Sequence, residues 1–300
     1  MRIRDAANEY LVDIEVRGYS KKTIRTTKVK LDIFCRWCEE VEEIDDTEDI
    51  RLPIIKKYIA YMQKRGLKST YVNGTGKSLK SFVQYCYNED YGCFNTKGKW
   101  IYVKEKKPHV VAYTPKQARQ LLAGCAGNSF LDLRDYCIIA MFLETGIRCQ
   151  ELYQLKVSDI HDDYFIVHGK NMKDRSVAIT PFLKKAMMKY ERARENYFEL
   201  RPAESNYFLS YRGFAMTNSG IEAMFKRRSK LVEGGGVRIS AHTCRHFWAQ
   251  SQLKLGVLSI YEISRALGHE SLQITETYLR SLSEADIVKA AKSSSVMMNI

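Results

Sequence analysis

The sequence predicts a mainly α-helical fold in two parts, a helical N-terminal domain and a larger mixed α/β domain with one small antiparallel sheet. Helical spacing of apolar residues dominates most of the chain. Short β-branched and aromatic runs are few and lie between residues 164 and 210. Between the two parts, the basic stretch Asn95–Pro108 lacks helical periodicity and carries Gly98. We therefore expect domains at residues 1–95 and 109–300, joined by a basic linker at 96–108 that lies near any bound polyanion.

The N-terminal domain reads as a four-helix module without an internal repeat. Its helices are predicted from apolar spacing, from Ser20 and Ser69 as starting residues and from Pro53 in a first turn. The expected helices are Ile3–Val16, a long segment from Ser20 through Trp37, a third from Pro53 through Met62 and a fourth from Ser69 through Tyr85. The acidic run Glu39–Asp49 separates the second from the third.

The second domain is expected to begin with a helix capped by Thr114 and Pro115 and ending near Ala123. A strongly apolar helix follows, and two strands flank the polar turn Gly169–Asp174 as a hairpin. The remaining expected elements are helix Leu131–Glu144, strands Tyr164–His168, Ser176–Thr180 and Tyr207–Ser210, and helices Pro181–Tyr197, Ser219–Val232, His242–Leu255, Ser259–Leu267 and Ser271–Ser281.

The charge of the chain favours a polyanionic partner, with nucleic acid as the first candidate. The formal net charge is +13 and the pI is about 9.2. Residues 1–108 carry 22 basic and 16 acidic side chains, and residues 109–300 carry 26 and 19, so both halves are basic. A basic surface that only maintains solubility is the alternative interpretation.

The eight cysteines and the N-terminus indicate a cytoplasmic protein with reduced thiols. The N-terminal residues lack the apolar core of a signal peptide, and no run of about 18 apolar residues predicts a membrane span. Cys35 and Cys38 have the spacing of half a zinc site, but no matching second pair follows. We therefore expect no metal site.

Six residues in the second half carry the chemistry, each within a short local pattern. The patterns are TGIRCQEL at Thr145–Leu152, HGKNMKD at His168–Asp174, HTCRH at His242–His246, LGHE at Leu267–Glu270 and ETYL at Glu276–Leu279. The six residues are Arg148, Lys170, His242, Arg245, His269 and Tyr278. Two arginines, a lysine, two histidines and a tyrosine are what metal-free cleavage of a phosphodiester requires.

Arg148 and Arg245 are candidates for gripping one phosphate, because guanidinium groups bind phosphate oxygens in a bidentate manner. His242 and Arg245 are three residues apart at the start of a predicted helix, so both side chains can reach one ligand. The helix N-terminus there also favours an anion. Glu151 either orients a catalytic side chain or is an ordinary exposed charge.

Lys170 lies in the predicted hairpin turn, where it can protonate a leaving alkoxide, and Lys173 in the same turn is the competing candidate. His269 follows Gly268, a predicted helix cap. Tyr278 lies on the next predicted helix, and its phenol can attack phosphorus and conserve the bond as a phosphotyrosyl ester. The sequence has neither a phosphate-binding G-x-x-x-x-G-K-[ST] loop nor paired carboxylates for two metals, so we expect no cofactor.

On these motifs the sequence resembles the tyrosine recombinases, or phage integrase family, over nearly its whole length. Its size and two-part organisation look most like Xer-type and simple two-domain integrases. The resemblance implies a SAM-like core-binding domain followed by a tyrosine-recombinase catalytic domain. Cys244 stands where leucine is common in the family, and Phe247 and Trp248 stand where a threonine is frequent. We interpret these departures as packing changes.

The resemblance also implies a role for each residue. Arg148 and Arg245 would grip the phosphate, and Lys170 would act as the general acid for the 5′-oxygen. His242 would transfer or share a proton, His269 would bond the scissile phosphate, and Tyr278 would form a 3′-phosphotyrosyl link.

The family further implies a site-specific recombinase or integrase, of the kind that mobile elements carry. It would work as a homotetramer on paired double-stranded DNA sites through a Holliday junction. The tail Ser283–Ile300 is expected to dock on a neighbouring protomer, with packing in cis as the alternative. A type IB topoisomerase is less favoured because of the compact size and the N-terminal module. A catalytically silent DNA-binding regulator is less favoured because all six residues are present.

Overall fold

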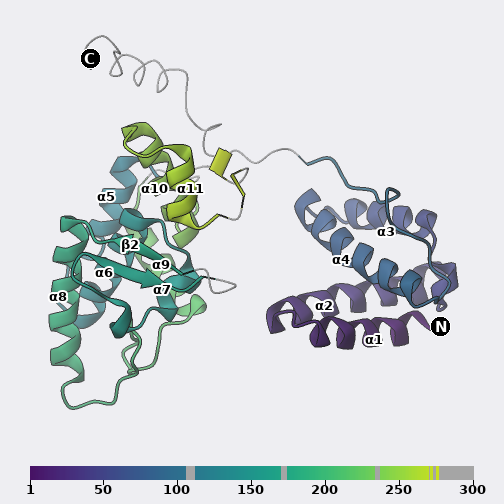
Figure 1. The fold of residues 1–300 in the computed structure, drawn as a ribbon, viewed down its shortest axis with the longest axis horizontal. Coiled ribbons are helices and arrows are strands. Elements are labelled where there is room, and N and C mark those ends of the chain that lie inside the picture. Colours follow the sequence, from purple (N-terminus) through teal and green to yellow (C-terminus); the bar gives the residue numbers. More distant parts are fainter. Residues whose placement is uncertain (106–111, 170–173, 234–236, 270, 273–274, 277–300) are drawn as a thin grey trace, which may run out of the picture. The chain divides into compact units, whose positions relative to one another are not determined.

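The structure is a computed structural model that describes residues 1–105, 112–169, 174–233, 237–269, 271–272 and 275–276. The chain forms two compact units, Met1–Lys107 and Pro108–Ile300, and each is described by itself. As predicted, the fold is mainly helical with one small antiparallel sheet (Figure 1). None of the helices in these ranges is long and apolar enough to cross a membrane.

The N-terminal unit contains four α-helices around an aromatic core. The Ser20 hydroxyl accepts the backbone N–H of Thr23 and so caps the second helix, as expected from the sequence. Phe34 and Tyr58 meet edge to face, with ring centroids 5.0 Å apart. The elements are α1 Ile3–Val16, α2 Lys21–Trp37, a π-turn Cys38–Glu42, a 3₁₀ turn Thr47–Asp49, α3 Leu52–Lys64 and α4 Ser69–Asn88. Cys35 and Cys38 are buried free cysteines of this core.

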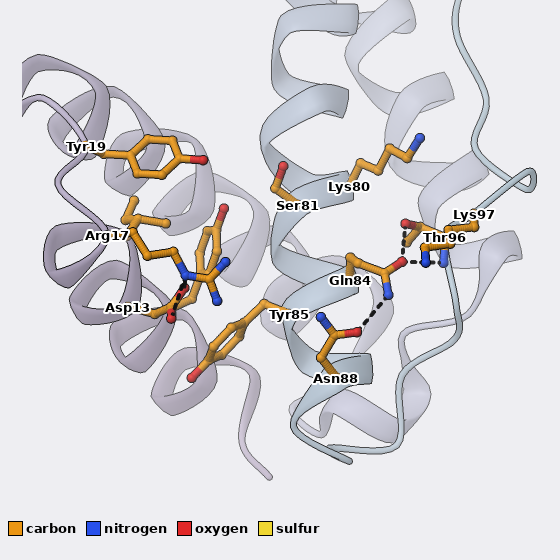
Figure 2. A pocket seen from close by; sticks show the side chains of 12 residues that line it. Asp13, Arg17, Tyr19, Lys80, Ser81, Gln84, Tyr85, Asn88, Thr96 and Lys97 are labelled. Atoms are coloured by element: carbon orange, nitrogen blue, oxygen red, sulfur yellow. Dashed lines mark hydrogen bonds and ion pairs between the residues drawn. The ribbon is translucent and has the colours of Figure 1, made fainter. Parts of the chain in front are cut away.

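A concavity of about 320 Å³ with mixed polar and aromatic side chains lies between α1 and α4 in this unit. Figure 2 shows that its side chains bond to one another: Arg17 pairs with Asp13, and Gln84 accepts from Thr96 and donates to Asn88. These bonds hold the wall of the concavity together. None of the candidate catalytic residues lines it.

The C-terminal unit is built around one buried helix, α6 (Phe130–Thr145). Apolar side chains surround this helix on all sides, and Cys137 through Phe142 have no exposed surface, which is the pattern of a helix enclosed by its neighbours. It packs against α8 and α10 (Figure 1). The other elements are α5 Pro115–Ala123, α7 Cys149–Gln154, a 3₁₀ turn Val157–Asp159, β1 Tyr164–Val167, β2 Arg175–Ala178, α8 Pro181–Phe198, α9 Asn218–Arg228, a 3₁₀ turn Ser229–Leu231, α10 Ala241–Leu255 and α11 Ile260–Leu267.

Strands β1 and β2 form an antiparallel pair, with Tyr164 opposite Ala178 and Val167 opposite Arg175. At the turn end of the hairpin, the His168 ring bonds Asp174 at 2.8 Å and Asp159 at 3.2 Å. These contacts fix the position of the strand ends that flank the turn.

A buried charge network ties α9 to α6. The Asp135 carboxylate, with no exposed surface, accepts from Arg134 and from Arg228. Arg228 also donates to Asp132 and to the backbone carbonyl of Gly124. Because each charge is paired and hydrogen-bonded, the network holds this side of the unit in one arrangement.

Two predicted elements differ from the structure. The run Tyr207–Ser210 is not a strand: within it only Leu209 forms an isolated bridge, to Ala215. Its apolar side chains enter the core from an irregular segment, which a β-like composition does not distinguish from a strand. The predicted helix Ser219–Val232 is shorter: α9 is capped by Thr217 and becomes a 3₁₀ turn at Ser229.

Candidate active site

Arg148 is placed by the short connection between α6 and α7. Helix α6 ends at Gly146, whose φ of 62° is the left-handed conformation of a helix cap. Two residues later, Arg148 precedes the first residue of α7. Arg148 therefore lies at the start of a helix rather than in the core, as predicted, and its side chain is 42% exposed.

Glu151 binds Arg148 in two places. Its Oε2 accepts the Arg148 backbone N–H at 2.7 Å, and its Oε1 accepts from Arg148 Nη1 at 2.8 Å. The backbone bond satisfies an N–H that the start of a helix leaves without an intrahelical partner. Glu151 is buried and so is not an ordinary exposed charge.

Arg175, which our sequence reasoning did not single out, binds the same carboxylate. Its Nη1 and Nη2 donate to the two Glu151 oxygens at 2.9 and 2.8 Å, and its Nε donates to the Ala266 carbonyl at 2.8 Å. Burial alone would raise the pKa of Glu151. Bonds and charge from Arg175, and bonds from Arg148, outweigh burial and lower that pKa to about 2. Glu151 is thus ionised at neutral pH.

Arg245 is buried in α10 and joins the ends of two other helices. Its Nη1 donates to the Gly146 carbonyl at 2.8 Å, and its Nη2 donates to the Leu267 carbonyl at 2.7 Å. Both carbonyls lie at helix C-termini, where partial negative charge favours a cation. Ser240 caps α10 by accepting the Thr243 backbone N–H at 3.3 Å.

His269 follows directly on α11. Gly268 caps that helix with a φ of 64°, and its carbonyl accepts from Arg148 Nη2 at 2.5 Å. The His269 Nδ1 lies 2.7 Å from the hydroxyl of Thr275. Burial, reinforced by the charges of Arg245, Arg148 and Arg175, lowers the pKa of His269 to about 4. Its ring is therefore neutral at pH 7.

His242 lies in the first turn of α10, three residues before Arg245 as predicted. Its ring meets that of His246 at 4.1 Å between centroids. Burial, followed by the charges of Arg245 and Arg238, lowers the pKa of His242. His246, which we did not single out, has its pKa lowered to about 4 by burial and then by His242 and Arg245. Its spacing of four from His242 is the sequence signal that could have identified it.

The structure therefore brings together four segments that lie far apart in the sequence. Arg148, Arg175 and Arg245 all donate to atoms of residues 266–268, and His269 follows immediately. The predicted residues Lys170, Lys173 and Tyr278 lie outside the described residues. Elsewhere in the described ranges, no group of three His, Cys, Asp or Glu side chains is arranged to hold a metal. Arg148 and Arg175 share the Glu151 carboxylate, and Arg245 bonds only backbone carbonyls, so the three guanidinium groups leave an excess of positive charge that suits an anion.

Such a site defines a class of protein that binds an anion with fixed arginines. Comparison with known families identifies the class further: the phage integrase family matches residues 112–285, and the family's N-terminal SAM-like domain matches residues 7–90. The chain belongs to the phage integrase family. It is a site-specific tyrosine recombinase, an enzyme that binds DNA and breaks and rejoins it.

Individual relatives span most of the chain. The tyrosine recombinase XerC of Thermodesulfovibrio yellowstonii is 27% identical over 267 residues, which cover 87% of this chain and 86% of the relative. The tyrosine recombinase XerD of Listeria monocytogenes is 26% identical over 277 residues, covering 87% and 89%. The similarity therefore includes both units.

Solved structures share the fold at lower identity. XerH bound to its difH substrate after cleavage has a TM-score of 0.71 at 18% identity, covering 94% of this chain and 82% of that one. A lambda integrase tetramer bound to a Holliday junction has a TM-score of 0.72 at 16% identity, covering 93% and 77%.

Proposed function

We propose that the recombinase cleaves one DNA strand with Tyr278 and stores the phosphodiester as a 3′-phosphotyrosyl ester. The bond that forms joins the phenol oxygen to phosphorus, and the bond that breaks is between phosphorus and the 5′-oxygen. A 5′-hydroxyl of the partner duplex then attacks the ester, restores the phosphodiester and releases Tyr278. Exchange of one strand pair creates a Holliday junction, and exchange of the second resolves it.

Arg148 and Arg245 are the groups that we assign to the non-bridging oxygens of the scissile phosphate. The observation that carries this assignment is that both arginines are fastened to one turn, through the carbonyls of Gly268 and Leu267. Fixed cations next to a phosphate stabilise the charge that accumulates in the transition state without reorganising during the reaction. This arrangement supports electrostatic catalysis by the protein's own side chains.

His269 is assigned as a hydrogen-bond donor to the same phosphate. With a pKa of about 4, the ring is neutral and carries one proton. If the Thr275 hydroxyl donates to Nδ1, that proton lies on Nε2, where it can be donated to a phosphate oxygen. The contact with Thr275 thus supports a ring that faces the phosphate with a donor.

Proton transfer is assigned to His242 and Lys170. His242 has a lowered pKa, so a neutral ring is available to take or share the phenol proton. Lys170, in preference to Lys173, supplies the proton that the 5′-oxygen needs as it leaves. The reaction is then balanced without a metal or a nucleotide cofactor.

The active assembly that we propose is a homotetramer on two paired duplex sites, in the cytoplasm. The lambda integrase structure that shares the fold is a tetramer on a Holliday junction. The tail Ser283–Ile300 would dock on the neighbouring protomer and couple the active sites. The positive charge of both halves supports a protein that grips DNA with each of them.

A suicide substrate tests the proposal. The binding site is first selected from a pool of random duplexes by the full-length protein. A nick is then placed next to the cleavage position, so that the short fragment carrying the free 5′-hydroxyl diffuses away after cleavage. We expect the wild type to accumulate a covalent complex and Tyr278→Phe to accumulate none. Absence of the complex in the wild type would overturn the mechanism, and a complex in Tyr278→Phe would overturn the assignment of the nucleophile.

A further inference from the structure

Arg175 is placed where the hairpin and the phosphate site meet. It is the first residue of β2 and follows directly on the polar turn Gly169–Asp174. Its side chain is 14% exposed, so most of it is enclosed by protein. No role was assigned to it from the sequence.

Three nitrogen atoms of Arg175 are already committed to protein partners. Two donate to the separate oxygens of Glu151, and Nε donates to the Ala266 carbonyl. The guanidinium group thus lies between β2, α7 and the end of α11. A planar group with donors on three sides is suited to fix all three elements at once.

The guanidinium groups of Arg175 and Arg148 lie next to each other at Gly268. A Cβ atom added to Gly268 would stand 3.1 Å from Arg175 Nη1 and 3.3 Å from Arg148 Nη1. Two neighbouring guanidinium groups repel each other unless an anion is shared between them, and both bond Glu151 Oε1. Arg175 therefore holds the carboxylate in the orientation that Arg148 uses.

We propose that Arg175 is a positioning residue for strand cleavage, which locks Glu151 against Arg148 and ties the hairpin to the turn that carries His269. The inference rests on the proposed roles of Arg148 and His269. A rotation of Glu151 would release both the backbone and the side chain of Arg148. Loss of the Ala266 bond would free the turn at 266–269 from β2. Arg175 acts through these residues, while Arg148 and Arg245 bind the phosphate.

Arg175→Lys tests the proposal, because lysine keeps the charge but cannot form the bidentate contact together with the third bond. We expect covalent-complex formation on the nicked substrate to slow about 100-fold, the scale of a misplacement of about 1 Å in a catalytic group. DNA affinity should stay within about twofold, since phosphate contacts elsewhere dominate binding. A loss confined to DNA affinity would overturn the proposal and indicate a direct DNA contact.

Arg228→Lys is the matched control. Arg228 also bonds carboxylates and a backbone carbonyl, and its side chain is 18% exposed, but its partners are Asp132, Asp135 and Gly124. Both variants are assayed at a temperature where circular dichroism shows them folded. Slowing of cleavage in Arg175→Lys but not in Arg228→Lys supports positioning. Equal slowing in both would mean that Arg175 is only structural.

A double-mutant cycle with Glu151→Gln separates positioning from general disruption. Because Arg175 acts partly through Glu151 and partly through Ala266, Arg175→Lys should slow cleavage less in the Glu151→Gln background than in the wild type. Multiplication of the two separate effects would overturn the proposal. The two possible failures are distinguishable. If the proposed mechanism is wrong, no protein, including the wild type, forms the Tyr278-dependent complex. If only the positioning role is wrong, Arg175→Lys forms the complex at the wild-type rate.

Titration of His269 tests whether the charge of Arg175 acts on the turn that carries this ring. Arg175 is one of the three arginines whose charge lowers the pKa of His269. In folded Arg175→Gln, we expect NMR titration of His269 to show a pKa closer to the ordinary 6.5. In Arg228→Gln the His269 titration should coincide with that of the wild type. An unchanged His269 titration in Arg175→Gln would show that Arg175 does not act on this turn.

Discussion

Arg148 and Glu151 are joined within a single helical turn, by one bond to the Arg148 backbone N–H at 2.7 Å and one to its Nη1 at 2.8 Å. The same carboxylate accepts both Nη atoms of Arg175 from β2. One buried anion therefore organises two cations of the site. Substitution of Glu151 therefore allows the contribution of this charge to stability to be measured apart from its contribution to catalysis.

Glu151→Ala is expected to lower the free energy of unfolding of the C-terminal unit by about 3–5 kcal/mol, because it leaves the largely buried Arg175 without its counter-charge. Urea unfolding of the full-length chain, followed by circular dichroism, measures the change. Glu195→Ala, at an exposed position on α8, serves as the control and should stay within about 0.5 kcal/mol of the wild type. Similar midpoints for the two variants would contradict the structural importance of the Glu151 pair.

The stabilisation by Glu151 should disappear in acid. The pKa of Glu151 is about 2 in the folded protein against an ordinary 4.5, so the unfolded chain binds this proton first as pH falls. The contribution is complete above about 4.5 and is lost as pH decreases toward 2. We expect the difference in unfolding free energy between the wild type and Glu151→Gln to shrink across this interval. A difference that does not vary with pH would argue against the lowered pKa.

Gly146→Ala should destabilise the C-terminal unit by about 2–4 kcal/mol, from a left-handed backbone and from overpacking. A Cβ atom there would stand 2.9 Å from Leu267 Cδ2 and 3.0 Å from Trp248 Cε3. Gly256 provides a matched control, because its φ of 68° is similar but nothing lies within 4 Å of an added Cβ. Gly256→Ala should cost only about 1 kcal/mol. Equal melting temperatures for the two variants would rule out the predicted clash.

His168 should titrate above the ordinary value of 6.5. Hydrogen bonds to Asp174 and then to Asp159 raise its pKa. The stabilisation that this ring gives the hairpin is therefore present below the unfolded pKa and is lost as pH rises through the folded pKa. NMR titration of His168 in Asp174→Asn should show a lower pKa than in the wild type. Asp162→Asn, at an exposed position nearby, should leave the titration unchanged.

Thr275→Val should slow formation of the covalent complex about 10-fold, the cost of one hydrogen bond that orients His269. The hydroxyl is completely buried, so water does not replace it readily. Thr275→Ser keeps the hydroxyl and should remain within about threefold of the wild type. If valine and serine variants cleave at the same rate, the Thr275 hydroxyl does not set the orientation of the ring.

Local patterns predicted much of the fold. Ser20, Thr114 and Ser259 cap their helices as their residue types and spacing indicate. The strongly apolar sequence predicted the helix that became α6. The short α7 was not predicted, because six residues are too few for a clear periodicity. The apolar triplet Tyr207–Leu209 was wrongly assigned to a strand, since burial alone does not require a ladder.

In the site, likewise, the sequence predicted local pairs of residues but not their contacts with distant segments. The pairs His242 and Arg245, and Arg148 and Glu151, are three residues apart on helical segments, so their proximity is a local property. The contacts of Arg175 connect residues 24 and 91 positions apart. An arginine at the edge of a predicted turn is usually solvated, and its sequence neighbours do not reveal a partner in another element.

By itself, the sequence determined the helical character of both units, the small hairpin and the basic charge of both halves, and it contained the residue types that we propose for phosphoryl transfer. These properties follow from residue type and short-range spacing. Only the tertiary structure decided that Arg148, Arg175 and Arg245 converge on residues 266–268, and that Glu151 is buried between two of them. Packing around α6 sets these relationships, because it brings the ends of α6, α10 and α11 together over separations as large as 120 residues.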